Sequence, residues 1–96
     1  MLEIQRQAQL VGDIHETLSN MCGSRIRVRA NLGRSKIIER EGVLTQTHPQ
    51  LFIVEVEEKR GRTARQSYQY VDVLTGTVEL SDCTSGETIF PDLNDN

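Results

Sequence analysis

Cations and apolar residues alternate along residues 25–30 of this 96-residue chain. Alternation with a period of two is typical of a β-strand that has one face on a core and one face in solvent. The apolar members then face the core, and the guanidinium groups of Arg25, Arg27 and Arg29 stand in a row on the other face. Such a row repels itself unless carboxylates, phosphates or water offset the charge. The pattern therefore predicts a strand whose outer face meets something anionic.

Four more β-forming segments follow this strand, and residues that favour turns or bends separate them. The strands are expected at residues 34–46, 51–56, 66–71 and 77–80. A charged hairpin loop is expected at 59–63, and a compact turn with one 3₁₀ step at 72–76. Asn31 and Gly33 tolerate positive φ, so they predict a tight hairpin turn after the first strand. Gly42 predicts a bulge or bend in the second strand, and Pro49 predicts the turn after that strand.

The N-terminal part is predicted to form a short helix near residues 14–22. Asp13 begins a capping-box sequence, and Gly23 stands where a helix needs a left-handed cap. Apolar residues at helical spacing form one stripe: Ile14, Leu18 and Met21. Residues 2–11 repeat this spacing, so we expect an earlier helical turn or helix there, which Gly12 and Asp13 interrupt.

Five short and closely connected strands cannot bury two faces as a flat sheet. Curling into a small barrel reduces the exposed edges, so we expect a mainly β fold: an N-terminal helix and a five-stranded SH3-like barrel. The expected organisation is an N-terminal extension at 1–12, a helix-plus-barrel domain at 13–80, and an acidic, mobile tail at 81–96. Ile89 and Phe90 are the exception in the tail, and are expected to dock on the barrel or on a neighbour.

Composition argues against several classes of protein. The chain has no apolar run of the roughly 18 residues that a membrane helix needs, and its N-terminal residues do not resemble a signal peptide. We therefore expect a cytoplasmic protein in which Cys22 and Cys83 are free thiols. His15 and His48 stand alone, without further ligands at metal spacing, and no catalytic constellation is present. The sequence thus predicts no enzyme, no cofactor and no metal site.

Charge is distributed unevenly, since ten of the eleven Lys and Arg residues lie between positions 25 and 65 while the whole chain carries a net charge of −3. Six of these cations form the candidate surface for binding a partner or a phosphate: Arg25, Arg27, Arg29, Arg34, Lys36 and Arg40. Arginine predominates, and it binds phosphate or carboxylate in a bidentate manner. A second interpretation is a solvated face that Glu39, Glu41 or Glu55 balances across the strands.

Tyr68 and Tyr70 are expected on one face of their strand. Aromatic residues beside a basic groove suit the stacking of unpaired bases. Burial in the core is the stronger interpretation, because the chain has only two tyrosines and two phenylalanines.

Several segments between about residues 13 and 80 form one recognisable pattern: Arg29-Ala30-Asn31-Leu32-Gly33-Arg34, Ile38-Glu39-Arg40, Gly42-Val43-Leu44, Leu51-Phe52-Ile53-Val54, Ser67-Tyr68-Gln69-Tyr70, Asp72-Val73-Leu74-Thr75 and Thr77-Val78-Glu79-Leu80. This pattern closely resembles the Veg family, small cytosolic proteins of Gram-positive bacteria. The resemblance implies an SH3-like barrel and a role in stimulating the expression of biofilm-matrix genes. It implies no enzyme and brings no assigned active-site residues. Leu32 departs from the family pattern, which often has a second glycine there.

Two functions follow from these observations. The first, which we prefer, is a regulatory adaptor that binds a transcription regulator through the barrel surface. The second is a direct nucleic-acid-binding protein that uses the basic β-hairpin. Salt-dependent binding to DNA or RNA is expected only for the second function and therefore distinguishes the two. An uncovered barrel edge or the N-terminal helix also suits a homo-oligomer.

Overall fold

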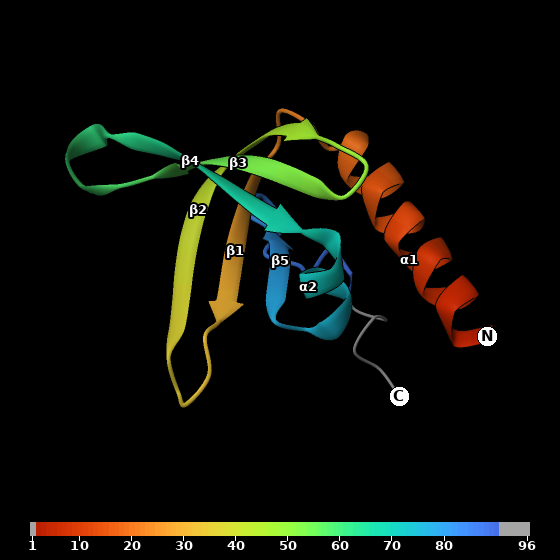
Figure 1. The fold of residues 1–96 in the computed structure, drawn as a ribbon. Helices are drawn as coiled ribbons and strands as arrows, with labels where there is room; N and C mark the ends of the chain where they lie inside the picture. The colour runs from red at the N-terminus through yellow and green to blue at the C-terminus, as the bar shows by residue number, and fades with distance from the viewer. Residues whose placement is uncertain (1, 91–96) are drawn as a thin grey trace.

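The computed structural model describes residues 2–90, with side chains from residue 6 onward. Its elements in chain order are α1 (Leu2–Ser19), β1 (Arg25–Asn31), β2 (Ile37–Thr47), β3 (Leu51–Glu57), the 3₁₀ turn η1 (Lys59–Gly61), β4 (Thr63–Gln69), α2 (Tyr70–Thr75) and β5 (Val78–Asp82). The five strands form one antiparallel sheet in the order β4-β3-β2-β1-β5 (Figure 1). The prediction of a mainly β fold with an N-terminal helix is confirmed.

The sheet is curved but does not close into a barrel. β4 and β5 lie at its two edges and are not paired with each other in the described part of the chain. Figure 1 shows the β1–β2 hairpin and the β3–β4 hairpin diverging as two arms, so the sheet opens between them. The SH3-like barrel therefore stays a prediction. Self-association also stays a prediction, and the outer edge of β4 is available for it because no described strand pairs there.

The core lies where one face of the sheet, here called the inner face, meets α1 and α2. Burial alternates along β1 as the sequence pattern predicts, with Ile26 and Val28 buried and the three arginines exposed on the outer face. Every strand except β4 contributes buried apolar side chains, and so do both α-helices. These core residues are Ile14, Leu18, Ile26, Val28, Leu44, Phe52, Val54, Val56, Tyr70, Val73, Val78 and Leu80. The core thus fixes which side of each strand faces inward.

The N-terminal helix is longer than predicted. α1 is one continuous helix from Leu2 to Ser19, and Gly12 and Asp13 do not interrupt it. Gly12 is exposed and a Cβ there would meet no atom within 4 Å, so it costs helix propensity without breaking the helix. Ile14 and Leu18 are buried against the core, and this packing outweighs the local signal. The predicted interruption was therefore wrong, and residues 2–12 belong to α1.

The segment after β4 is an α-helix rather than the end of a strand and a 3₁₀ turn. β4 ends at Gln69, and Tyr70 is the first residue of α2. Tyr70 is fully buried, with its ring centroid 5.6 Å from those of Phe52 and His15. The β-forming run predicted a strand through residue 71. The chain instead turns into α2 at Tyr70, and this turn places the Tyr70 side chain in the core. Tyr68 and Tyr70 consequently do not share a strand.

Gly42 has a different role from the predicted bulge. Its pairing is regular, and the register shift of β2 lies between Leu44 and Gln46. A Cβ at Gly42 would overlap the backbone carbonyl of Glu55 in the neighbouring strand. A glycine inside a strand can mark a close approach of two backbones as well as a bulge, and here it marks the close approach.

Gly33 and Pro49 lie in turns, and Asn31, the last residue of β1, leads into the first of them. Asn31 Oδ1 accepts a hydrogen bond from the Gly33 N–H at 2.9 Å, and Gly33 has φ of 87°. Pro49 lies between β2 and β3, in a turn where the His48 N–H donates to the Leu51 carbonyl at 2.8 Å. These two turns set the register of the hairpins on either side of β2.

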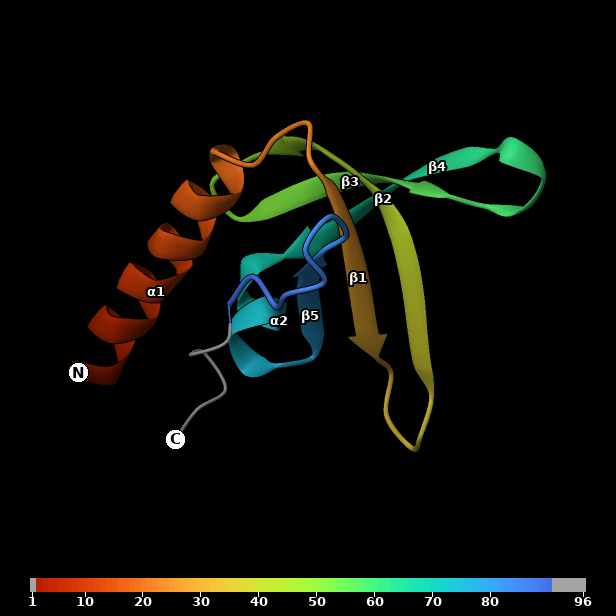
Figure 2. The ribbon, with the colours of Figure 1, turned by 180° about the vertical axis from the view of Figure 1, so that it is seen from behind.

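The segment that follows β5 is folded as far as the structure describes it. The Asp82 N–H donates to the Glu87 carbonyl at 2.9 Å, and the Ile89 N–H donates to the Leu80 carbonyl at 2.9 Å. Ile89 and Phe90 pack against the core, as predicted. Figure 2 shows the segment running from the end of β5 back towards α2. Residues 91–96 lie outside the described residues, and the mobility of the tail stays a prediction.

Candidate functional site

The outer face of β1 carries the three alternating arginines, and glutamates stand beside them. Arg27 lies directly opposite Glu41 in β2, and Arg29 lies opposite Glu39. Two nitrogens of Arg27 donate to Glu41 Oε2, Nη2 at 2.9 Å and Nε at 3.3 Å. Arg29 Nε lies 3.9 Å from Glu39 Oε2. The cross-strand register therefore brings opposite charges together.

Arg25 completes this arrangement with a carboxylate from β3. Its guanidinium donates to Glu57 and lies 3.8 Å from Glu41 Oε1. The hydrogen bond and the charge of Glu57 raise the pKa of Arg25, and Glu41 raises the pKa of Arg27 in the same way. Glu55, one of the expected partners, instead accepts a hydrogen bond from Thr63 Oγ1 at 3.1 Å. The outer face is thus a mixed-charge surface, as the second interpretation of the sequence has it.

The structure does not bring the six predicted cations into one patch. Arg34 and Lys36 lie in the exposed loop between β1 and β2. Arg40 lies directly opposite Val28, a buried core residue, so it is on the inner side of the sheet. Arg40 is nevertheless exposed.

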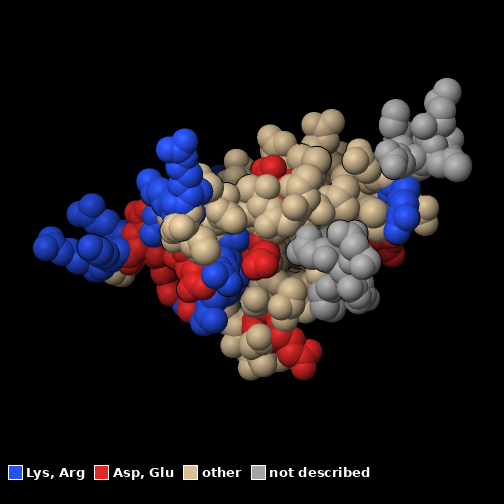
Figure 3. Space-filling view, turned by 90° about the horizontal axis from the view of Figure 1, so that it is seen from below, with Lys and Arg blue, Asp and Glu red and all other residues tan. Residues whose placement is uncertain are grey.

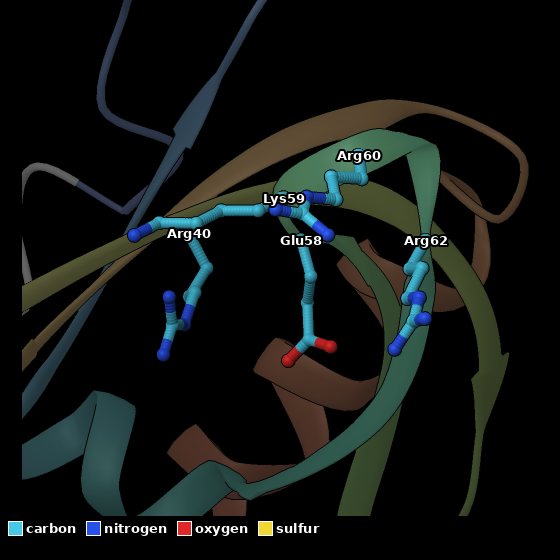
Figure 4. Close-up of a pocket in the computed structure, with 5 residues that line it drawn as sticks. All are labelled: Arg40, Glu58, Lys59, Arg60 and Arg62. Carbon is cyan, nitrogen blue, oxygen red and sulfur yellow. The ribbon is translucent and has the colours of Figure 1, made fainter.

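Arg40 joins two hollows on the inner side of the sheet. The larger, about 380 Å³, is lined by charged residues alone (Figure 4): Arg40, Glu58, Lys59, Arg60 and Arg62. The smaller, about 150 Å³, is lined largely by apolar and aromatic side chains: Ala30, Leu32, Ile38, Arg40, Gln66 and Tyr68. We call the two together the inner groove.

The cations of the inner groove differ from those of β1. Glu58 is the one carboxylate that lines either hollow, and Figure 4 shows it between Arg40 and Arg62. Within residues 6–90, no carboxylate lies within 4 Å of the charged groups of these four cations. Seen from below, Lys and Arg side chains gather where the two hairpins project, with acidic side chains among them (Figure 3). The groove therefore carries an excess of positive charge.

Tyr68 forms the aromatic part of the groove. Its ring stacks on Phe52, with centroids 5.6 Å apart and planes at 30°. The side chain is half-buried, and burial raises the pKa of its phenol while the charge of Arg40 opposes the increase. The phenol is thus neutral at physiological pH, and it lies within electrostatic reach of Arg40.

The inner groove was largely missed by the sequence analysis. The sequence predicts a charged loop at residues 59–63 but no site there, and it groups Arg40 with the β1 arginines in one candidate surface. One signal could have corrected this, because Arg40 shares its alternation with the apolar Ile38 and Leu44. The contribution of Gln66 and Tyr68 depends on the β3–β4 register, which no local motif specifies.

The described residues were also compared with what a metal site, a membrane span or a disulfide would need. No group of three or more His, Cys, Asp or Glu side chains that could hold a metal ion occurs among them. None of the described helices is long and apolar enough to cross a membrane. Cys22 and Cys83 are free, as predicted.

Comparison with known proteins identifies the family. A search of the curated proteins finds no match. A family model described as "Biofilm formation stimulator VEG" matches residues 9–81, which run from the middle of α1 into β5. This is most of the chain and nearly the same stretch over which the sequence resembles the family. The chain therefore belongs to the VEG family of biofilm formation stimulators.

Proposed function

We propose that this protein is a non-enzymatic regulator of biofilm formation that binds another protein, and that its partner is a transcription regulator of biofilm-matrix genes. The family description supports the biological role. The mixed-charge outer face of β1 supports the protein partner. Alternating charges of both signs complement a protein surface and fix its register, whereas they give no net positive field to attract phosphates.

The ion pairs of β1 also argue against nucleic-acid binding by that face. A phosphate that approaches Nε and Nη2 of Arg27 would compete with Glu41, whose oxygen lies 2.9 Å from Nη2. The neighbouring carboxylate would also repel the phosphate at close range. A protein partner can instead extend the existing alternation with its own charged groups.

A pull-down from nuclease-treated bacterial cytosol tests this proposal. The wild-type protein is expected to recover a transcription regulator, and the triple variant Arg25→Glu, Arg27→Glu, Arg29→Glu is expected to lose it while remaining folded by circular dichroism. Arg65→Glu is a control, since Arg65 also lies on the outer face but in β4, away from β1. The proposal is contradicted if no regulator is recovered, or if the triple variant recovers it as well as the wild type.

A further inference from the structure

We infer that the inner groove binds single-stranded nucleic acid, with phosphates at its charged hollow and a base at Tyr68. This inference goes beyond the proposed function and concerns the opposite side of the sheet from the β1 arginines. It rests on the charges of the groove, on its one aromatic side chain, and on how Arg40 connects the two.

The charged hollow has the groups that a phosphate backbone needs. Four cations line it and one carboxylate faces them. Three of the cations are arginines, whose planar guanidinium binds phosphate oxygens in a bidentate manner. Unlike the arginines of β1, these cations form no ion pair with a described carboxylate, so phosphate binding does not require a competing carboxylate to leave.

The smaller hollow has the groups that an unpaired base needs. One side of the Tyr68 ring stacks on Phe52, which holds the ring in place, while the half-buried side chain still lines the hollow. Stacking of a base on such a ring is tolerant of sequence, because every base has a π-face. The amide of Gln66, on the same strand and the same hollow, can both donate to and accept from a base edge.

The two hollows share Arg40, so phosphate and base sites are contiguous. A duplex does not fit this arrangement, because its bases are already stacked and cannot reach Tyr68. An acidic protein segment offers carboxylates to the same cations, but it has no base to stack on Tyr68. The net charge of −3 does not decide the question, since attraction within a groove depends on the charges that line it.

Fluorescence anisotropy with two labelled ten-nucleotide probes, oligo(dT) and oligo(U), tests the inference at ~50 mM salt. The full chain is expected to bind them with an affinity that falls steeply as salt increases. Arg40→Gln is expected to weaken binding at least about threefold and to reduce the log–log salt slope by about 0.7, the loss of one phosphate contact. Arg65→Gln is the matched control. It makes the same charge change, but Arg65 lies opposite Glu55 on the outer face and should leave both quantities unchanged.

A second variant tests the base site. Tyr68→Leu keeps an apolar side chain on Phe52 but removes the stacking surface, so binding is expected to fall about tenfold without a change in salt slope. Circular dichroism checks that Tyr68→Leu is folded. If Tyr68→Leu is unfolded, the binding and salt slope of Arg40→Gln test the inference instead. The inference is overturned if neither oligonucleotide binds, if Arg65→Gln weakens binding as much as Arg40→Gln, or if a labelled acidic peptide binds the groove while the oligonucleotides do not. The pull-down of a regulator is independent of all these results.

Discussion

Replacing glycine by alanine should have opposite effects on stability at Gly42 and at Gly12, because the two glycines are packed differently. Gly42 is buried beside the Glu55 carbonyl, whereas Gly12 lies exposed in α1. We expect Gly42→Ala to lower the free energy of unfolding by about 1–3 kcal/mol, because β2 and β3 must move apart. Gly12→Ala should raise it by about 0.5–1 kcal/mol, because alanine favours the helix. Urea unfolding of both variants measures this, and an unchanged Gly42→Ala protein would contradict the close approach.

The hydroxyl of Tyr70 is the one buried side-chain polar atom without a hydrogen-bond partner among the described residues. Burial raises the pKa of Tyr70 above its usual value of 10.0, although the nearby His48 backbone opposes the increase. The unfolded chain therefore loses this proton first, and the stability contributed by the neutral phenol is lost as the pH rises above about 10.

Tyr70→Phe follows from this environment. At pH 7 the variant should be as stable as the wild type or about 1 kcal/mol more stable, because it removes an unsatisfied polar group. Above pH 10 its stability should decrease less than that of the wild type, with Tyr68 contributing to the decrease that remains. Thermal unfolding between pH 7 and 11 measures both effects. A clear loss of stability at pH 7 would mean that the hydroxyl has a partner.

The elements of the fold differ in how far the sequence predicts them. β1 and β3 were located correctly, because alternation and β-propensity there agree with burial. The start of α1 and the whole of α2 were not located correctly, since both depend on tertiary packing. Gly12 is tolerated because α1 packs against the core, and α2 begins at Tyr70, whose side chain is buried in the core. Local propensity alone cannot reveal either contact.

The segment after β5 leads to a prediction at the same scale. Phe90 packs against the core beside Val73 and Leu80. We expect Phe90→Ala to lower the free energy of unfolding by about 1–2 kcal/mol, less than for a fully buried phenylalanine because Phe90 is only partly buried. Val71→Ala on the exposed side of α2 is the control and should change little, since Val71 is 44% exposed. If both variants unfold at the same urea concentration as the wild type, the docking of this segment does not stabilise the fold.

The whole molecule presents two arginine-rich surfaces with different electrostatic character. On the outer face of β1 the arginines contact glutamates, and in the inner groove the cations face a single glutamate. The sequence itself shows that ten of the eleven Lys and Arg residues lie between positions 25 and 65. The alternation of Arg40 with Ile38 and Leu44 could have placed Arg40 on the inner side, but no local motif specifies the β3–β4 register that brings Gln66 and Tyr68 beside it. One hairpin in sequence thus supplies side chains to both sides of the sheet.

Chemical-shift mapping by NMR tests this division most directly. The isotope-labelled protein is titrated with oligo(dT), and the backbone amides that shift are located on the sheet. We expect the largest shifts at the inner groove, in Arg40, at residues 59–62 and in Gln66 and Tyr68, with little change in Arg25, Arg27 and Arg29. Shifts confined to the β1 arginines, or no shifts at all, would contradict the account.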